Sequence, residues 1–252
     1  MLLKKNFYIW FMLISFCACD NTEDGSYSLP ISLDSLIAHR GSWLINMHPE
    51  NSMAAFREAL SMKLYGTEFD VRQTKDDQLV ICHNELYAGK KIEDYSYDEL
   101  NVAKLTNGEN LPRLEDFLLI YKKTETEVKL IIDLKKCKIN KVLQLVDSFE
   151  VQDQVEYITF SKGYCRQLAN KGYGSKTFYL GGNYSPLDVR DTLGCYGISY
   201  SYKVFDKYPD WIEEARVLGM RIGVWIVNSK ESISDYLQKG VVVTTDRPNE
   251  HF

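Results

Sequence analysis

Acidic residues two positions apart mark a candidate cation site. Glu68 and Asp70 lie within a β-rich run, so their carboxylates point to the same side of the expected strand. Two carboxylates held in this way suit a hard divalent cation, which prefers oxygen ligands. Asp133 and Lys135 repeat the spacing after the apolar run 130–132 and add a third carboxylate and a cation.

Further polar residues end two other β-rich runs. His39 ends the first run and Arg40 opens the loop that follows it, while His83 ends a short run after a turn. If these ends meet, two imidazoles, three carboxylates, one ammonium group and one guanidinium group gather at one place. Such a convergence is far more informative than any one of the pairs.

The fold must bring these strand ends together. Eight short β-rich runs alternate with helix-like stretches, which predicts parallel strands joined by right-handed crossovers. This many strands in one chain favours a closed (β/α)8 TIM-type barrel, an α/β fold with its active site at the carboxyl ends of the strands. The strands are expected at 36–39, 67–71, 128–134, 155–160, 177–180, 196–200, 221–227 and 241–244. The helices are expected at 52–64, 114–122, 139–149, 164–171, 209–218 and 230–239.

One connection is too short for a helical crossover. Only a turn at 75–77 separates the run that contains Asp70 from the run that ends at His83, so an antiparallel hairpin is expected after the second strand. If Asp76 and Asp77 are the two central turn residues, Asp70 lies opposite His83. Directly opposed side chains share a face about 5 Å apart.

Composition and charge exclude several classes of protein. The 252 residues are 45% hydrophobic and 26% charged, with a formal net charge of -5, which is typical of one globular domain. An acidic chain without a basic cluster is not expected to bind nucleic acid. Buried free thiols are expected over disulfides at the four cysteines of the body of the chain: Cys82, Cys137, Cys165 and Cys195. The sequence does not indicate an oligomeric state.

The first residues have the pattern of an export signal. Lys4 and Lys5 precede an apolar run at 7–16, which is too short to cross a bilayer because a spanning helix needs about twenty residues. The segment that ends at Cys19 resembles a bacterial lipoprotein signal. We therefore expect a signal peptide at 1–18, a tether at 19–30 and a barrel domain at 31–252, with a lipid anchor at Cys19. The expected location is the bacterial cell envelope.

A set of motifs in a fixed order resembles the glycerophosphodiester phosphodiesterase family, within the phosphatidylinositol phospholipase C-like superfamily. The motifs are HRG at 39–41, PENS at 49–52, EFDV at 68–71, TKD at 74–76, His83, LPRLE at 111–115, DLK at 133–135, WIVN at 225–228 and TDRP at 245–248. The resemblance implies a barrel enzyme that splits glycerophosphodiesters into glycerol 3-phosphate and an alcohol with a bound divalent ion, Ca²⁺ or Mg²⁺. It further implies that the glycerol hydroxyl attacks first and that water opens the resulting cyclic phosphate.

The resemblance and the residue types together suggest roles. Glu68, Asp70 and Asp133 would hold the metal ion. Arg40 and Lys135 would bind the substrate phosphate. His39 and His83 would act as acid and base, because the reaction moves two protons and imidazole titrates near neutral pH.

Three neighbouring motif residues and one tryptophan complete the candidates. By its match to PENS, Glu50 is expected to orient Arg40 or a histidine, while Asn51 and Ser52 are expected to cap the following helix. Trp225 either lines the substrate pocket or belongs to an aromatic core layer. His48, which lies outside the catalytic motifs, is expected at the surface.

Departures from the family pattern keep other functions open. Asp133 stands where the family usually has Glu, Asn84 stands where it has Asp, and the segment 85–91 differs. One alternative is a phospholipase C- or D-type activity on lysophospholipid or phosphatidylinositol. The other is a binder of phosphate ligands without catalysis.

Overall fold

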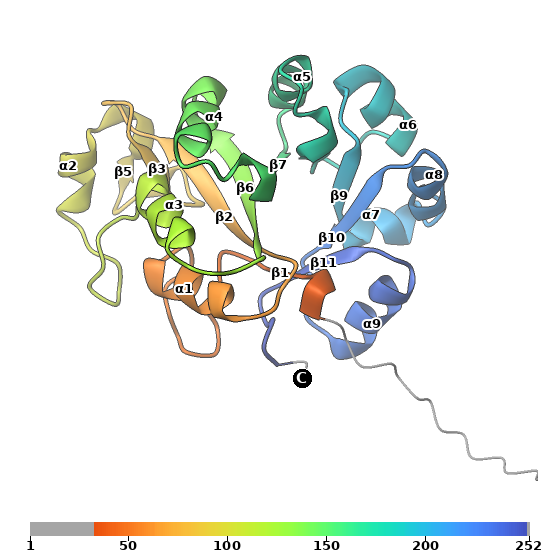
Figure 1. Ribbon diagram of the computed structural model, residues 1–252, viewed down its shortest axis with the longest axis horizontal. Coiled ribbons are helices and arrows are strands. Elements are labelled where there is room, and N and C mark those ends of the chain that lie inside the picture. The colour runs from red at the N-terminus through yellow and green to blue at the C-terminus, as the bar shows by residue number, and fades with distance from the viewer. Residues whose placement is uncertain (1–32, 251–252) are drawn as a thin grey trace, which may run out of the picture.

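The chain folds into a closed barrel of eight parallel strands. The computed structural model describes residues 33–250. Neighbouring strands pair in the order β1, β2, β6, β7, β8, β9, β10 and β11, and β11 pairs with β1 to close the sheet (Figure 1). Their bounds are β1 (Leu36–Ala38), β2 (Gly66–Gln73), β6 (Lys129–Lys136), β7 (Val155–Thr159), β8 (Thr177–Tyr179), β9 (Gly197–Ser201), β10 (Arg221–Trp225) and β11 (Val242–Thr245). The predicted (β/α)8 barrel is confirmed.

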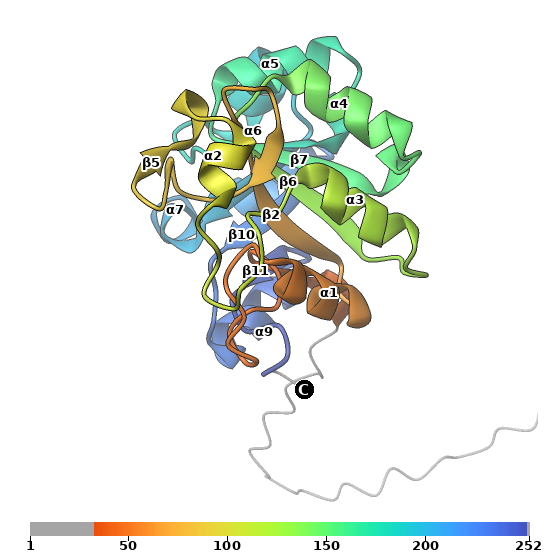
Figure 2. The ribbon, with the colours of Figure 1, turned by 90° about the vertical axis from the view of Figure 1, so that its left-hand side faces the viewer.

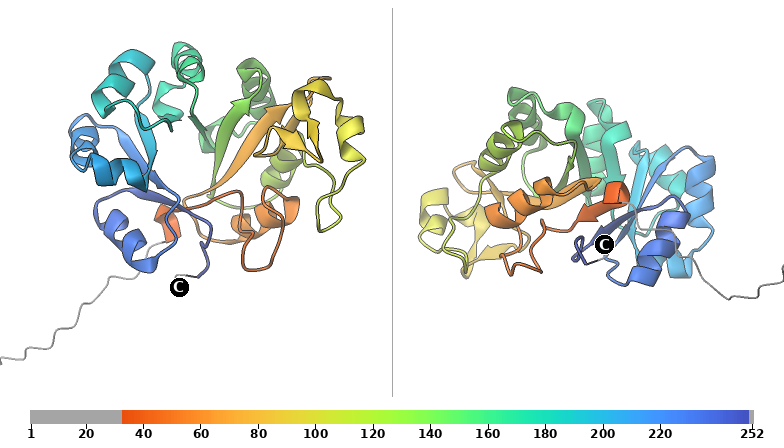
Figure 3. Two further views of the ribbon diagram at one scale, coloured as in Figure 1. Left: turned by 180° about the vertical axis from the view of Figure 1, so that it is seen from behind. Right: turned by 60° about the horizontal axis from the view of Figure 1, so that its bottom comes forward.

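Helices surround the strands on the outside of the barrel (Figures 1 and 3). They are α1 (Met53–Ser61), α3 (Leu114–Lys122), α4 (Ile139–Ser148), α5 (Lys162–Asn170), α6 (Pro186–Asp188), α7 (Tyr202–Lys207), α8 (Trp211–Val217) and α9 (Lys230–Gln238), while α2 (Tyr97–Asn101) belongs to an insertion beside the barrel. Ser52, Ser161 and Ser229 cap α1, α5 and α9, because each side-chain oxygen accepts a hydrogen bond from a backbone N–H of the first turn. All six predicted helices are present, whereas α2, α6 and α7 were not predicted.

The excursion after β2 is an antiparallel hairpin, as predicted, but its register differs by one residue. β2 pairs with β3 (Leu79–Ile81) so that Val71 lies opposite Ile81. The turn has three residues instead of two: Thr74 N donates to Gln78 O at 2.9 Å, and Asp77 adopts a left-handed φ of 66°. The prediction that Asp70 lies opposite His83 is therefore wrong.

A small insertion follows the hairpin. It contains the two-stranded ribbon β4 (Leu86–Tyr87) and β5 (Lys90–Lys91) and then α2. Figures 1 and 2 show β5 and α2 next to each other on the hairpin side of the barrel. Val80, Ile92, Leu100 and Leu111 form a separate buried cluster, so the insertion has a core of its own.

The amino-terminal end of the barrel is closed by polar contacts to one buried carboxylate. Glu156 Oε1, at the start of β7, accepts hydrogen bonds from Tyr65 Oη at 2.8 Å, Lys129 Nζ at 2.8 Å and Arg221 Nη2 at 2.5 Å. These partners lie at or next to the starts of β2, β6 and β10. Burial raises the pKa of Glu156, so three donors around one carboxylate offset the cost of burying its charge.

Several sequence expectations concern residues that the structure does not describe. The signal peptide at 1–18, the tether at 19–30 and the anchor at Cys19 lie outside the described residues, as does the start of the expected barrel domain. Within residues 33–250, the four cysteines form no disulfide. No helix in this range is long and apolar enough to cross a membrane.

Candidate active site

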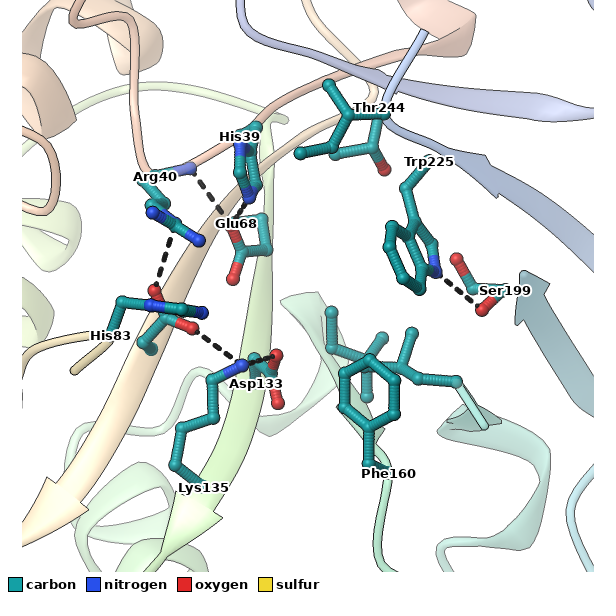
Figure 4. A pocket seen from close by; sticks show the side chains of 14 residues that line it. His39, Arg40, Glu68, His83, Asp133, Lys135, Phe160, Ser199, Trp225 and Thr244 are labelled. Atoms are coloured by element: carbon teal, nitrogen blue, oxygen red, sulfur yellow. Dashed lines mark hydrogen bonds and ion pairs between the residues drawn. The ribbon is translucent and has the colours of Figure 1, made fainter. Parts of the chain in front are cut away.

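Eight of the nine predicted site residues line one cavity at the carboxyl ends of the strands (Figure 4). The cavity has a volume of about 130 Å³. The eight are His39, Arg40, Glu68, Asp70, His83, Asp133, Lys135 and Trp225. Glu50 lies just behind them, in contact with Arg40. The barrel thus brings together groups that are nearly two hundred residues apart in sequence.

Three buried carboxylates meet on neighbouring strands. Glu68 and Asp70 come from β2, Asp133 comes from β6, and Asp70 and Asp133 are direct register partners. One oxygen of each lies within 4.8 Å of one oxygen of the others, and Asp133 Oδ1 is buried without a hydrogen-bond partner. Three converging oxygens with one unsatisfied acceptor fit a hard divalent cation.

Crowding disfavours the charge of two of these carboxylates. Burial, together with the charges of Asp70 and Asp133, raises the pKa of Glu68 well above its usual value. Burial raises the pKa of Asp133 to about 6, against the opposing effect of Lys135. A bound cation would offset the crowding of these carboxylates and favour their ionised form.

Two cations face the acidic cluster. Lys135 Nζ lies 2.6 Å from Asp133 Oδ2 and 3.1 Å from Asp70 Oδ1. Arg40 Nε lies 3.5 Å from Asp70 Oδ2, and Arg40 Nη1 donates to Glu50 Oε2 at 2.5 Å. Although burial opposes ionisation of Asp70, the charges of Lys135 and Arg40 and the hydrogen bond from Asn51 hold the pKa of Asp70 below its usual value. Both cations can therefore contact an anion that binds beside the acids.

Asn51 has a different position from the one predicted. Ser52 Oγ caps α1 by accepting from Ala55 N at 3.1 Å, as expected. Asn51 does not cap this helix: its Nδ2 donates to Asp70 Oδ2 at 2.8 Å, and its Oδ1 accepts from Asp70 N at 3.2 Å. The left-handed φ of 59° at Asn51 turns its side chain toward β2. Asn51 therefore orients an acidic residue of the site.

His39 is held by an acidic residue to which sequence analysis assigned no role. His39 Nδ1 lies 2.7 Å from Asp246 Oδ1, and His39 Nε2 lies 4.0 Å from Glu68 Oε2. Asn228 Nδ2 donates to Asp246 Oδ2 at 2.9 Å. Against the effect of burial, the hydrogen bonds from His39 and Asn228 lower the pKa of Asp246. The imidazole of His39 thus has a carboxylate behind it.

His83 enters the cavity from the end of the hairpin. Its Nδ1 lies 3.0 Å from Asn84 Oδ1, and its backbone oxygen accepts two hydrogen bonds from the guanidinium of Arg72. Burial is the largest of the effects that lower the pKa of His83. The neutral form of this imidazole is therefore favoured near pH 7.

The remaining wall of the cavity is mainly apolar, with Ser199 and Thr244 as its polar residues. Trp225 on β10 packs edge-to-face against Phe160, with ring centroids 5.8 Å apart, and Trp225 Nε1 donates to Ser199 O at 2.8 Å. Ile158, Leu180 and Ile226 continue this wall. Trp225 therefore contributes to the cavity lining and also packs against another aromatic ring. Phe160, which is 51% exposed, was not singled out from the sequence.

The comparisons with known proteins agree with this geometry. The model of the glycerophosphoryl diester phosphodiesterase family matches residues 39–250. The chain belongs to this family. It is accordingly an enzyme of the phosphodiesterase class, and its family match includes every predicted site residue.

Individual relatives support the family membership. A glycerophosphodiester phosphodiesterase structure from Parabacteroides distasonis is 35% identical, with a TM-score of 0.81, and the match covers 86% of this chain and 94% of that one. A glycerophosphodiester phosphodiesterase from Caldanaerobacter subterraneus is 26% identical over 84% of this chain and 93% of its own length. A phosphodiesterase from Oleispira antarctica, solved with the product sn-glycerol-3-phosphate, shares the fold at 19% identity and a TM-score of 0.73, over 84% of this chain and 93% of that one.

Proposed function

We propose that this family member hydrolyses glycerophosphodiesters to glycerol 3-phosphate and an alcohol. The observation that carries the proposal is the meeting of two imidazoles, three buried carboxylates and two cations around one small cavity. Family membership and the product bound to the Oleispira antarctica relative support this substrate class.

The residues of the cavity would have the following roles in the reaction. A divalent ion, Ca²⁺ or Mg²⁺, held by Glu68, Asp70 and Asp133 would neutralise charge on the substrate phosphate. Arg40 and Lys135 would donate hydrogen bonds to the phosphate oxygens.

His39 and His83 would perform the two proton transfers. One imidazole takes the proton of the attacking hydroxyl, and the other gives a proton to the leaving alkoxide. His39 Nδ1 is paired with the Asp246 carboxylate, whereas His83 Nδ1 is paired with a neutral amide. The two imidazoles therefore have different hydrogen-bond partners, as expected for a pair in which one ring donates a proton and the other accepts one.

The deciding experiment is a turnover panel. Glycerophosphocholine, glycerophosphoethanolamine and glycerophosphoglycerol are each offered with Ca²⁺, with Mg²⁺ and with a chelator, and release of glycerol 3-phosphate is measured. We expect turnover of at least one diester with a metal ion and its loss on chelation. Turnover of lysophosphatidylcholine or phosphatidylinositol alone would establish the phospholipase alternative instead. Metal-dependent binding of a diester without product release, unchanged by His39→Ala, would establish the non-catalytic binder.

We further propose export and a lipid anchor at Cys19, supported by Lys4, Lys5, the apolar run and the cysteine that follows it. We expect the full-length chain in the membrane fraction of a bacterial cell and Cys19→Ala in the soluble fraction. Equal partition of both proteins would contradict the anchor.

A further inference from the structure

His83 lies beyond the regular part of the hairpin. β3 ends at Ile81, and the last backbone hydrogen bond to β2 runs from Cys82 N to Asp70 O at 2.9 Å. His83 and the residues after it form a bend at the surface. A side chain in such a bend needs contacts other than the sheet ladder to keep one orientation.

Arg72 supplies one such contact. It lies on β2 two residues after Asp70, and its Nε and Nη2 donate to the backbone oxygen of His83 at 3.1 Å and 2.7 Å. The planar guanidinium offers two parallel N–H groups, which a lysine cannot reproduce. The two hydrogen bonds from Arg72 therefore link the backbone of His83 to β2, the strand that contains Glu68 and Asp70.

Asn84 supplies the second contact, to the ring itself. Its Oδ1 lies 3.0 Å from His83 Nδ1. An amide oxygen only accepts hydrogen bonds, so this contact places the hydrogen of the neutral ring on Nδ1 and leaves the lone pair on Nε2. In Figure 4 the ring lies between the labelled Arg40 and Lys135 side chains, where a phosphate would bind.

We propose that Arg72 and Asn84 are positioning residues for His83. Arg72 fixes where the backbone holds the imidazole, and Asn84 fixes which ring nitrogen is free to exchange a proton with the substrate. Asn84 does for His83 what Asp246 does for His39, but with a neutral acceptor. The inference rests on the proposed function, because it gives His83 a proton to move.

The test compares variants that differ in one property. Asn84→Leu removes the acceptor at similar size, and Asn84→Asp keeps an oxygen acceptor. Arg72→Ala removes the guanidinium group that donates to His83 O, and added guanidinium ion can replace this group. We expect Asn84→Leu and Arg72→Ala to lower kcat about ten- to a hundredfold with KM changed less than about twofold, because outer contacts of functional groups typically have effects of this size.

Rescue and matched controls separate positioning from folding. We expect Asn84→Asp to recover most of the kcat lost in Asn84→Leu, and guanidinium to restore part of the kcat of Arg72→Ala. Asn140→Leu and Arg57→Met alter exposed residues of α4 and α1 and are expected to keep wild-type kcat. Thermal unfolding of each variant shows whether it is folded at the assay temperature.

Failure of this inference can be told apart from failure of the proposed function. An inactive wild type would overturn the proposed function, and a fully active His83→Ala would overturn the proton-transfer role of His83 on which the inference rests. An active wild type with an inactive His83→Ala, but with wild-type kcat in both Asn84→Leu and Arg72→Ala, would overturn the positioning role alone. Equal losses in Asn84→Asp and Asn84→Leu would also overturn it for Asn84.

Discussion

The two imidazoles of the site follow different strands, and each has a partner at Nδ1. His39 follows β1 and is paired with Asp246, whereas His83 follows β3 and is paired with Asn84. In neither ring is the partner at Nδ1 one of the three acids that are suited to a metal ion. In the proposed function, proton transfer and metal binding would thus belong to separate side chains within one cavity.

Loss of either imidazole should strongly reduce turnover. We expect His39→Ala and His83→Ala each to reduce kcat about a hundredfold or more, because each removes a general acid or base. His48 is the matched control: its Nε2 lies 3.0 Å from Glu58 Oε2, and it does not line the cavity. His48→Ala should retain the wild-type rate. Steady-state kinetics at saturating metal measure all three, and retained activity in both cavity variants would remove the assigned acid and base.

Metal affinity should fall as the solution becomes acidic. A metal ion binds the ionised carboxylates, and burial raises the pKa of Asp133 to about 6 and that of Glu68 well above normal. Below about pH 6, protons therefore compete with the ion, and above it the competition from Asp133 ends. We expect calorimetric titration with Ca²⁺ or Mg²⁺ to give a weaker affinity at pH 5 than at pH 7.5. An affinity independent of pH over this range would contradict a site built on these acids.

The sequence predicted the charged and imidazole residues that line the cavity, because its motifs lie at or near the ends of the expected strands. It missed the role of Asp246, although the TDRP motif directly follows the last strand. In a closed barrel the last strand lies beside the first, so Asp246 had to be near His39. Asn51 was misassigned because capping was inferred from its place before a helix, and its left-handed backbone cannot be read from the residue type alone.

At the scale of elements, the turn before α1 joins a structural residue to a functional one. Ser52 caps the helix, and its neighbour Asn51 contacts Asp70 by two hydrogen bonds. Substitutions at Ser52 and Asn51 should therefore affect different properties: helix stability and the orientation of Asp70.

Substitutions in this turn should separate stability from metal binding. Ser52→Ala should lower the free energy of unfolding by about 1 kcal/mol, because it removes an N-cap, with little change in metal affinity. Asn51→Gly keeps the left-handed backbone but removes the contacts to Asp70, so it should weaken metal affinity more than Ser52→Ala does. Denaturant unfolding and metal titration of both variants check this pattern. The reverse pattern would restore Asn51 as the cap.

The regular elements were predictable and the irregular ones were not. Each barrel strand is a short β-rich run, and each long helix has an apolar face, so both patterns are visible in the sequence. α2, α6 and α7 have only five, three and six residues, too few to show a helical period. The hairpin register depends on the left-handed backbone of Asp77, with which the turn has three residues instead of the predicted two.

At the scale of the whole molecule, the two ends of the barrel differ: one contains the cavity and the other contains a buried hydrogen-bond network. The carboxyl end contains the cavity, and the amino end is closed around Glu156. Nothing in the mechanism requires Glu156, so its contacts are expected to serve stability alone.

Removal of this carboxylate should destabilise the fold and leave turnover intact. Glu156→Leu leaves Tyr65, Lys129 and Arg221 without their shared acceptor, and we expect a loss of about 1 to 3 kcal/mol in the free energy of unfolding. The value of kcat below the unfolding transition should match wild type. Thermal unfolding together with kinetics measures both. A large fall in kcat with unchanged stability would show that the two ends of the barrel are coupled.

The point where the described chain begins has a consequence for access. Leu33 lies just before β1, at the end of the barrel that Glu156 closes, while His39 and the acids lie at the opposite end. An anchor at Cys19, as proposed, would therefore join the chain at the end of the barrel opposite to the cavity mouth.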